Sequence, residues 1–416
     1  MTESIQAGSL LPPAAWFQAY RPEDHEDPYP FYRRLQSEQP ILYLEERRMW
    51  AVSRYEDVER ILKSPAAVRE RRNTLPPEKR DQVPAPAPQW ASIRRITDSW
   101  MLFRDAPSHT RLRGLVQPAF SPRRTERLRA SVTVIAGRLA ATLAEMPEPD
   151  LIADFAFPLP VLVVADLLGV PSEDHALFKE WSHAVARLLD VAIVLPDDVP
   201  VISRAMEEME VYFADLIRAR RKSPGEDLIS SLLAAADSGD RLSETELIST
   251  CILLLVAGHE TTVHLIGNAV QLLLTHPDEL ALLRSNPRLL PSAVEETLRF
   301  ESPVQMTDRL LAEPLLLGGE RLEQGANVML LLASANRDSD RFPEADRFRV
   351  SRSPNRHLAF ASGPHFCLGA PLARVEGEEA LRAFLAVSSA PELVPEKSRR
   401  RATILFRGWE ELRVRL

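Results

Sequence analysis

Seven stretches of this chain space their apolar residues at i, i+3 and i+4, the pattern of an amphipathic helix, and this pattern constrains the fold most strongly. The longest stretch covers residues 243–274, and Ser243 with Glu246 three positions later forms a capping-box pattern that predicts its start. The other six cover residues 122–145, 172–189, 200–222, 226–236, 277–284 and 290–301. The chain is therefore predicted to be mainly α-helical.

Strand signals are fewer and shorter than the helical ones. Residues 41–44 and 49–52 predict a β-hairpin, and residues 315–317 and 328–332 predict further short strands. The Pro-rich interval 70–91 is typical of a long loop, which is often mobile or functional, and we expect it to act as a lid. The predicted fold class is mainly α with a small β region.

Composition narrows the classes of function. The chain has 416 residues and a formal net charge of -8, from 51 basic and 59 acidic side chains, which argues against nucleic acid as a partner because phosphate binding needs a basic footprint. The two cysteines, Cys251 and Cys367, are too few for a disulfide framework or for a cysteine-rich zinc or iron–sulfur site. Such cysteine usage fits a reducing cytoplasm.

No segment is expected to enter a membrane. The longest apolar run, residues 251–258, is far shorter than the roughly 20 residues that cross a bilayer. Residues 1–13 lack a basic region followed by a long apolar stretch, so we expect neither a signal peptide nor an anchor. These features predict a cytoplasmic protein.

The most informative segment runs from His357 to Arg374 and places Cys367 in a Gly-bearing loop directly before a helix. A cysteine at a helix N-terminus is expected to have a lowered pKa, because the unpaired N–H groups favour the thiolate. Gly363 and Gly369 would allow the tight backbone and close approach that a flat macrocycle demands. One thiolate suffices for a haem iron, although a lone cysteine is more often an ordinary buried residue.

The spacing of this segment resembles the haem-binding loop of the cytochrome P-450 family, Phe-Gly-x-Gly-x-His-x-Cys-x-Gly, at Phe360, Gly363, His365, Cys367 and Gly369. Ala361 stands where the family usually has glycine, which bears on the local turn and not on the ligand. The resemblance implies that Cys367 is the axial ligand to the iron of haem b and that Gly369 belongs to the cofactor site.

A second motif pairs Glu296 with Arg299 at i, i+3 spacing, an arrangement that is common in solvated helix salt bridges. Residues 335–338 and 342–352 resemble the meander that in this family closes a buried Glu-Arg-Arg network. The resemblance implies a structural role for Glu296 and Arg299, with Arg352 as the third member.

The third motif, Ala-Gly-His-Glu-Thr-Thr at residues 257–262, lies in the middle of the longest predicted helix. Glycine and threonine weaken a helix there, so the sequence predicts a local distortion or groove, or a close contact with a crossing helix. The motif resembles the oxygen-binding region of the family, which implies that Thr261 donates a hydrogen bond to activated O2 and that Glu260 delivers protons. His259 and His264 are five residues apart, which excludes a His-Glu-x-x-His zinc motif.

Two haem propionates would need cationic or hydrogen-bonding partners. The resemblance assigns this role to His109 and Arg113, which have i, i+4 spacing, and to Arg309, His357 and His365. By position in the family, the substrate pocket is expected to include Leu253, Val256, Ala257, Val304 and Leu405. These pocket residues are apolar, which predicts a hydrophobic or amphipathic substrate.

The resemblance covers nearly the whole chain and implies one triangular, mainly helical domain, residues 1–416, built around a buried haem. Residues 1–20 are expected to form a flexible arm. The chain resembles the soluble bacterial type of the family, which points to a monomer and to electrons from NAD(P)H through an external ferredoxin and its reductase. Arg111, Arg123 and Arg124 are candidates for the ferredoxin-docking patch, or equally for an ordinary solvated helix face.

The function implied is a monooxygenase that inserts one oxygen atom of O2 into a small molecule, by hydroxylation or epoxidation, in bacterial secondary metabolism. Two alternatives are a peroxide-driven peroxygenase and a non-catalytic haem-binding protein. The peroxygenase is disfavoured because such relatives typically lack the acid–alcohol pair present here as Glu260 and Thr261.

Overall fold

The computed structural model describes the chain except for residues 1–26, 83–87, 187, 189–197, 236–241 and 402. The predicted N-terminal arm therefore lies outside the described residues, as do residues 83–87 of the predicted lid. The described part of the interval 70–91 is a loop, as predicted, and contains the short 3-10 turns Arg71–Thr74, Pro77–Gln82 and Pro88–Trp90.

Helices dominate the described chain, as predicted. They are α2 (Tyr29–Glu38), α3 (Tyr55–Lys63), α4 (Ala91–Thr97), α5 (Ser108–Val116), α6 (Pro122–Ala144), α7 (Pro158–Leu168), α8 (His175–Ala186), α9 (Asp198–Lys222), α10 (Leu228–Ala235), α11 (Glu244–Thr275), α12 (Pro277–Ser285), α13 (Leu290–Phe300), α14 (Leu332–Ala335) and α15 (Ala370–Val387). Each of the seven predicted stretches coincides with one of these helices to within three residues at either end. The Ser243 hydroxyl accepts a hydrogen bond from the Glu246 amide, and the Glu246 carboxylate accepts one from the Ser243 amide, which confirms the predicted capping box.

The main sheet has the strand order β1-β2-β7-β4-β3. Its strands are β1 (Ile41–Leu44), β2 (Met49–Val52), β3 (Ala67–Val68), β4 (Thr307–Leu311) and β7 (Asn327–Leu330). The hairpin of β1 and β2 is confirmed, and β2 pairs in parallel with β7. The strand predicted at 328–332 ends at Leu330 because the next residues enter α14.

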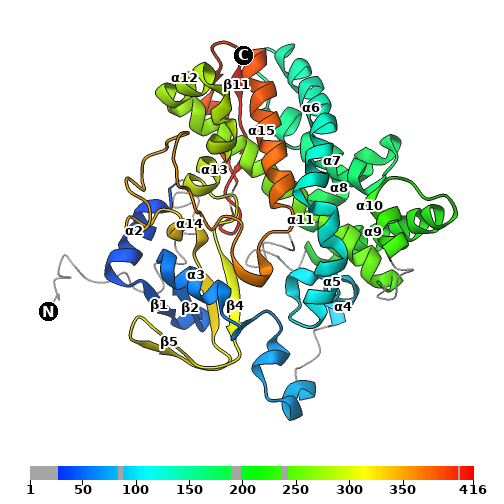
Figure 1. Cartoon of the computed structure of the whole chain (residues 1–416), viewed down its shortest axis with the longest axis vertical. Helices are drawn as coiled ribbons and strands as arrows, with labels where there is room; N and C mark the ends of the chain where they lie inside the picture. Colours follow the sequence, from blue (N-terminus) through cyan, green and yellow to red (C-terminus); the bar gives the residue numbers. More distant parts are fainter. Residues whose placement is uncertain (1–26, 83–87, 187, 189–197, 236–241, 402) are drawn as a thin grey trace.

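Three pairs of strands, each strand two or three residues long, complete the β structure. They involve β5 (Leu315–Leu317), β6 (Glu320–Leu322), β8 (Glu392–Leu393), β9 (Arg399–Arg400), β10 (Trp409–Glu411) and β11 (Val414–Arg415). Figure 1 shows β1, β2 and β4 on one side of the molecule, with α6, α7 and α9 on the other. The long helices α11 and α15 lie between these two regions.

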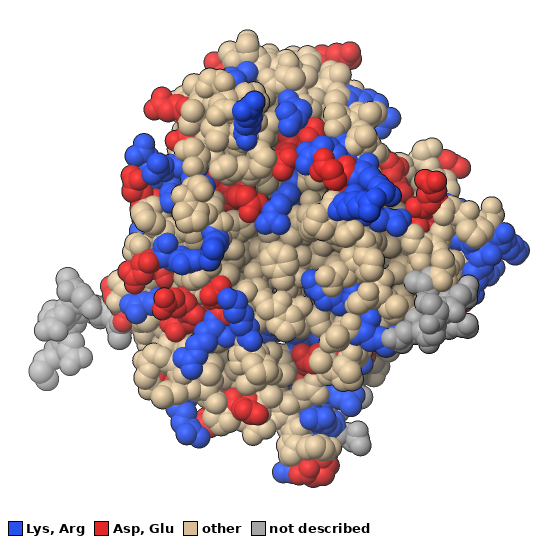
Figure 2. All heavy atoms as spheres, in the orientation of Figure 1, with Lys and Arg blue, Asp and Glu red and all other residues tan. Residues whose placement is uncertain are grey.

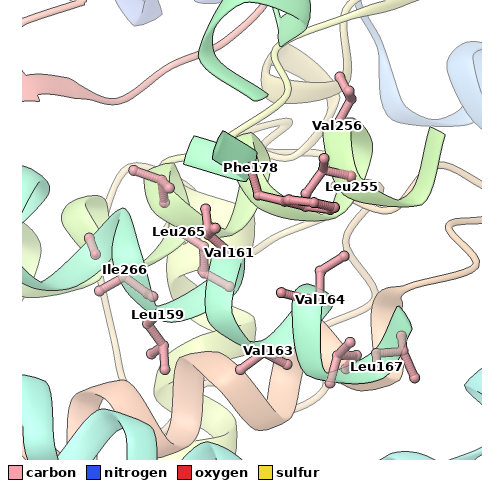
Figure 3. Close-up of a cluster of buried hydrophobic side chains, with 14 of the residues drawn as sticks. Leu159, Val161, Val163, Val164, Leu167, Phe178, Leu255, Val256, Leu265 and Ile266 are labelled. Carbon is pink, nitrogen blue, oxygen red and sulfur yellow. The ribbon is translucent and has the colours of Figure 1, made fainter. Parts of the chain in front are cut away.

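Helix α7 was not predicted, because its apolar residues cover every side and leave no helical period. Figure 3 shows its side chains, among them Val161 and Val164, in one cluster with Leu255 and Leu265 of α11 and Phe178 of α8. Most of its residues are buried, with Asp166 as the exposed exception, which explains why this segment, like α11, is largely apolar.

Helix α11 is the central helix of the described core. By length and composition alone it could cross a membrane, yet 78% of its most apolar window is buried inside the protein. Contacts with α7, α8, α9, α13 and α15 surround it. Such burial is typical of the core helix of a globular protein.

A buried ion network fixes the chain that precedes the Cys367 loop. The Glu296 carboxylate accepts two hydrogen bonds of 2.8 Å from Arg299 and one of 3.0 Å from Arg352. Both guanidinium groups also donate to backbone carbonyls of the segment 336–347. The structure thus brings together the three residues of the expected Glu-Arg-Arg network, and Glu296 and Arg299 are fully buried.

Replacing Glu296 by glutamine should lower the free energy of unfolding by about 3 kcal/mol or more, because two buried guanidinium groups would lose their counter-charge. Urea unfolding followed by circular dichroism measures this loss. Glu344→Gln is the matched control: its carboxylate pairs with Arg347 and Arg349 at the surface, where solvent screens the charges, so the loss of stability should be much smaller. Equal losses in the two variants would contradict a structural role for the buried network.

Candidate functional site

A cavity of about 380 Å³ lies between α11 and the loop that leads into α15. Cys367 and Thr261 both line it, and so do the predicted pocket residues Leu253, Ala257, Val304 and Leu405. Val256 does not line it. One residue along α11 turns a side chain by about 100°, and Val256 is instead fully buried in the helical core.

A backbone hydrogen bond and a glycine with positive φ fix the shape of the Cys367 loop. The Cys367 amide donates a 3.0 Å hydrogen bond to the Phe360 carbonyl. Gly363 has φ +71°, and a Cβ there would overlap the Leu62 carbonyl of α3, so glycine is required. Ala361 also has a positive φ, 56°, which explains why glycine suits this position and indicates a local strain of about 1 kcal/mol.

The two reasons that require glycine at position 363, a positive φ and a steric overlap, do not apply at Gly369. Its φ is -81°, and a Cβ there would meet nothing within 4 Å among the described residues. It lines the cavity next to Cys367, so the space beside it is open toward that cavity.

The prediction that the pKa of the Cys367 thiol is lowered is wrong in its net direction. Burial raises this pKa above the ordinary value, although the Gly369 and Ala370 amides and the Arg113 guanidinium all favour the thiolate. Desolvation therefore outweighs the helix N-terminus. A bound cation of sufficient charge would reverse this balance, because a thiol that coordinates a metal is deprotonated.

One side of the cavity carries basic side chains. His109, Arg113, Arg309 and His365 all line it, as predicted, and the two histidine rings lie 4.2 Å apart. Burial lowers the pKa of His365 to about 2 and that of Arg309 to about 10. Within the described chain, neither Arg113 nor Arg309 forms an ion pair with a carboxylate.

These residues fit a haem. A guanidinium as buried as Arg309 is costly without an anionic partner, and propionates would supply one. The thiol of Cys367 is the single soft ligand that a haem iron needs, and the rest of the lining is largely apolar. Cys367, His109, Arg113, Arg309 and His365 are the groups that would hold the cofactor.

Arg69 was missed by the sequence analysis and also lines the cavity. Its guanidinium forms a 2.8 Å ion pair with Asp308, next to Arg309, and only 9% of its side chain is exposed. It follows strand β3 without a recognisable spacing to any other motif residue. No local signal could have identified it, because its place depends on the pairing of β3 with β4.

His357 is not brought to the cavity, which corrects its assignment as a propionate partner. Its Nε2 atom lies 3.2 Å from a carboxylate oxygen of Glu295, and Arg374 binds the same carboxylate from the other side. These partners hold the pKa of Glu295 at about 2, against the effect of burial. His357 therefore connects α13 to the Cys367 loop instead of facing a ligand.

Thr261 and Thr262 bond back along α11 as predicted, to the carbonyls of Ala257 at 3.1 Å and Gly258 at 2.9 Å. The helix nevertheless stays α-helical without interruption from Glu244 to Thr275, so the predicted distortion does not appear in its hydrogen bonding. The predicted groove is present, because Ala257, Gly258 and Thr261 line the cavity.

Glu260 does not line the cavity, although Thr261 beside it does. Its carboxylate is 2% exposed and forms an ion pair with Arg401, and one oxygen lies 3.6 Å from Nε2 of His264. The expected acid therefore faces away from the cavity in this structure, toward the C-terminal segment.

A second buried acid does line the cavity and was not predicted. Glu376 of α15 is 2% exposed and contacts Thr262, and burial raises the pKa of its carboxyl to about 8. It is thus a neutral acid at neutral pH. Glu376 lies nine residues after Cys367, on the face of α15 that lines the cavity. This helical spacing from Cys367 could have identified it from the sequence.

Comparisons with known proteins agree with this site. A sequence model of the Cytochrome P450 family matches residues 173–386. The Vitamin D(3) 25-hydroxylase of Pseudonocardia autotrophica is 43% identical over 375 residues, which are 88% of this chain and 87% of that protein.

Two solved structures have the same fold. The Bacillus subtilis bacillaene polyketide synthase cytochrome P450 PksS superposes with a TM-score of 0.86 at 35% identity and covers 98% of this chain and 100% of its own. The myxobacterial cytochrome P450 CYP267B1, in complex with myristic acid, gives 0.85 at 39% identity, with 96% and 99% covered. The chain therefore belongs to the cytochrome P450 family: it is a monooxygenase that uses a haem iron and O2 to oxidise a small molecule, with electrons from a redox partner.

Proposed function

We propose that this enzyme hydroxylates or epoxidises an elongated apolar molecule of bacterial secondary metabolism. The observation that carries the proposal is one cavity that holds the Cys367 thiol, a side with basic residues and the Thr261 hydroxyl within an otherwise apolar lining. The names of the relatives support this substrate class, because they refer to vitamin D3, a polyketide pathway and myristic acid. An apolar lining excludes water and selects substrates by shape.

The cofactor and the residues around it would have separate roles in the reaction. When bound, haem supplies the oxidising chemistry that no side chain can perform. Cys367 would ligate its iron, Arg113 and Arg309 would pair with its propionates, and His109 and His365 would donate hydrogen bonds to them. Thr261 would turn its hydroxyl from the Ala257 carbonyl toward the reacting oxygen, and Glu260 would supply protons from behind the helix.

Thr261→Ala should uncouple the reaction, because the oxygen would lose its positioned hydrogen-bond donor while electrons still arrive. We expect product per NADPH to fall about tenfold or more, with hydrogen peroxide released instead. Myristic acid, a surrogate ferredoxin system and product analysis by mass spectrometry provide the assay.

Thr275→Ala is the matched control, because Thr275 lies on the same helix and makes the same bond to a carbonyl four residues earlier. It should behave as the unmodified enzyme. Unchanged coupling in Thr261→Ala, with O2 and reductant, would contradict the role given to this hydroxyl.

We infer that a ferredoxin with its reductase, using NAD(P)H, donates electrons at the face beside Cys367. A surface hollow there is lined by Arg113, Gln117, Phe366 and Cys367, and Phe366 is 40% exposed. Of the three arginines expected at a docking patch, Arg111 pairs with Glu246 and Arg124 donates to Ser231, whereas Arg123 is exposed. Figure 2 shows basic and acidic side chains interspersed over the face it displays, so a docking patch would be local.

Arg123→Glu should slow reduction by an acidic ferredoxin severalfold at low salt, with less effect at high salt, because the attraction between charged surfaces is screened. Stopped-flow absorbance measures the reduction, and a spectral titration with myristic acid measures substrate binding, which should not change. Arg288→Glu, on the exposed turn between α12 and α13, is the control. Equal effects of the two variants would refute docking at Arg123.

We further propose that residues 1–416 act as a single domain and that the enzyme is a soluble, cytoplasmic monomer. The near-complete coverage of relatives and the burial of α11 support this proposal.

A further inference from the structure

A polar stripe runs along one face of the apolar helix α11. Glu260, His264 and Asn268 are spaced at i, i+4 and i+8, which places them on the same face, and each is at most 2% exposed. The remaining buried residues of this helix are mostly apolar. Burying polar groups inside an apolar core costs free energy unless they are hydrogen-bonded, so three aligned polar residues there indicate a specific role.

His264 is the member of the stripe whose hydrogen bonding is incomplete. Neither ring nitrogen has a hydrogen-bond partner among the described residues, and the ring is 1% exposed. Its Nε2 atom lies 3.6 Å from Oε1 of Glu260, just beyond hydrogen-bond distance. A small rotation of either side chain would close this gap.

The C-terminal segment is shaped around this imidazole. A Cβ atom at Gly408 would overlap Nδ1 and Cγ of His264, so the absence of a side chain at Gly408 makes the space for the ring. The ring of Phe406, a residue that lines the cavity, lies 5.9 Å away. His264 thus lies behind the cavity wall, beside the acid that flanks Thr261.

Two arginines connect the stripe to the surface. Arg401 pairs with Glu260, and Arg400 donates a 3.3 Å hydrogen bond to Oδ1 of Asn268 and packs over the Trp409 ring. Their side chains are 27% and 16% exposed. The stripe therefore extends from the edge of the cavity to partly solvated groups.

The charged and titratable groups that face His264 are Glu260 on its own helix and Arg400 and Arg401 on the C-terminal segment. One turn further along α11, Glu301, Arg407 and Arg337 form an ion cluster, and Arg400 joins it through a 3.8 Å contact with Glu301. Burial, and then the charge of Arg400, lower the pKa of His264 to about 4. The imidazole is therefore neutral at working pH, with one N–H donor and one nitrogen lone pair.

We propose that His264 relays protons from solvent at the Arg400–Arg401 edge to the carboxylate of Glu260. The inference rests on the proposed function, in which Glu260 supplies protons to the reaction. The proton on Nε2 passes to Oε1 of Glu260, which becomes a carboxylic acid, while Nδ1 takes a proton from a hydronium ion that reaches it through water from the Arg400–Arg401 edge. The ring stays neutral but now carries its proton on Nδ1, and transfer of that proton to Nε2 through water restores the starting tautomer.

His264 acts through Glu260 and touches no reacting atom, so it is a positioning residue with a proton-transfer role. Its loss should limit the supply of protons, which differs from the loss of Thr261. We expect His264→Phe to slow NADPH oxidation and product formation together by about tenfold, with an increased solvent isotope effect in D2O. The KM for myristic acid should stay within about twofold, and little extra peroxide should form.

Two further variants separate a relay from a structural role. His264→Gln keeps a hydrogen-bond donor near Glu260 but cannot pass a proton through a ring, so it should retain the melting temperature and stay slow. His276→Phe is the control, because His276 is at the start of α12 with its Nδ1 atom 2.8 Å from the Leu272 carbonyl. Normal rates and isotope effect in His264→Phe, or full recovery in His264→Gln, would overturn the relay.

An independent readout needs no turnover. Nitrogen NMR of the reduced, carbon monoxide-bound enzyme with labelled histidines, assigned with His264→Gln, should show a neutral ring from about pH 8 to about pH 6. Its signals should shift in Glu260→Gln. A ring that titrates near its ordinary pKa, or ignores Glu260→Gln, would refute the relay; failure of the unmodified enzyme to oxidise any apolar probe would instead refute the proposed function.

Discussion

The burial of the Cys367 thiol and of the Arg309 guanidinium in one cavity is the constraint on which the site depends. Arg309 is 3% exposed without an ion pair in the described chain, and burial raises the pKa of Cys367. Both are unfavourable in the protein alone, and both become favourable once an iron and two propionates enter. The cofactor is thus expected to complete the electrostatics of the core as well as to perform the chemistry.

Ion pairs between other residues of the fold hold the Cys367 loop in place. Glu296 binds Arg299 and Arg352 behind the Cys367 loop, and Glu295 binds His357 and Arg374 beside it. The adjacent acids Glu295 and Glu296 of α13 therefore hold the chain on both sides of Cys367, at Arg374 and at Arg352. Helix α11 forms the opposite wall, where the back-bonded Thr261 and Thr262 leave the helix regular and present small side chains to the cavity.

Much of this could be predicted from the sequence, where periodicity or a motif carries the signal. The bounds of α6 and α11 follow from their apolar period to within two residues, whereas α7 has no period because its apolar residues cover every side. Cys367, Thr261 and the basic residues His109, Arg113, Arg309 and His365 were found through the family resemblance. Arg69 was missed, His357 was assigned to the cavity, and the direction of the Glu260 side chain could not be predicted, because side-chain direction depends on tertiary partners such as Asp308, Glu295 and Arg401.

The central claim is that Cys367 is the thiolate ligand of a bound haem, and the absorption spectrum of the reduced protein under carbon monoxide tests it most directly. The account predicts a strongly red-shifted Soret band in the purified enzyme that is lost in Cys367→Ala, while Cys251→Ala keeps it because Cys251 is fully buried on α11. Bound haem without that band, or a band that survives in Cys367→Ala, would contradict the account.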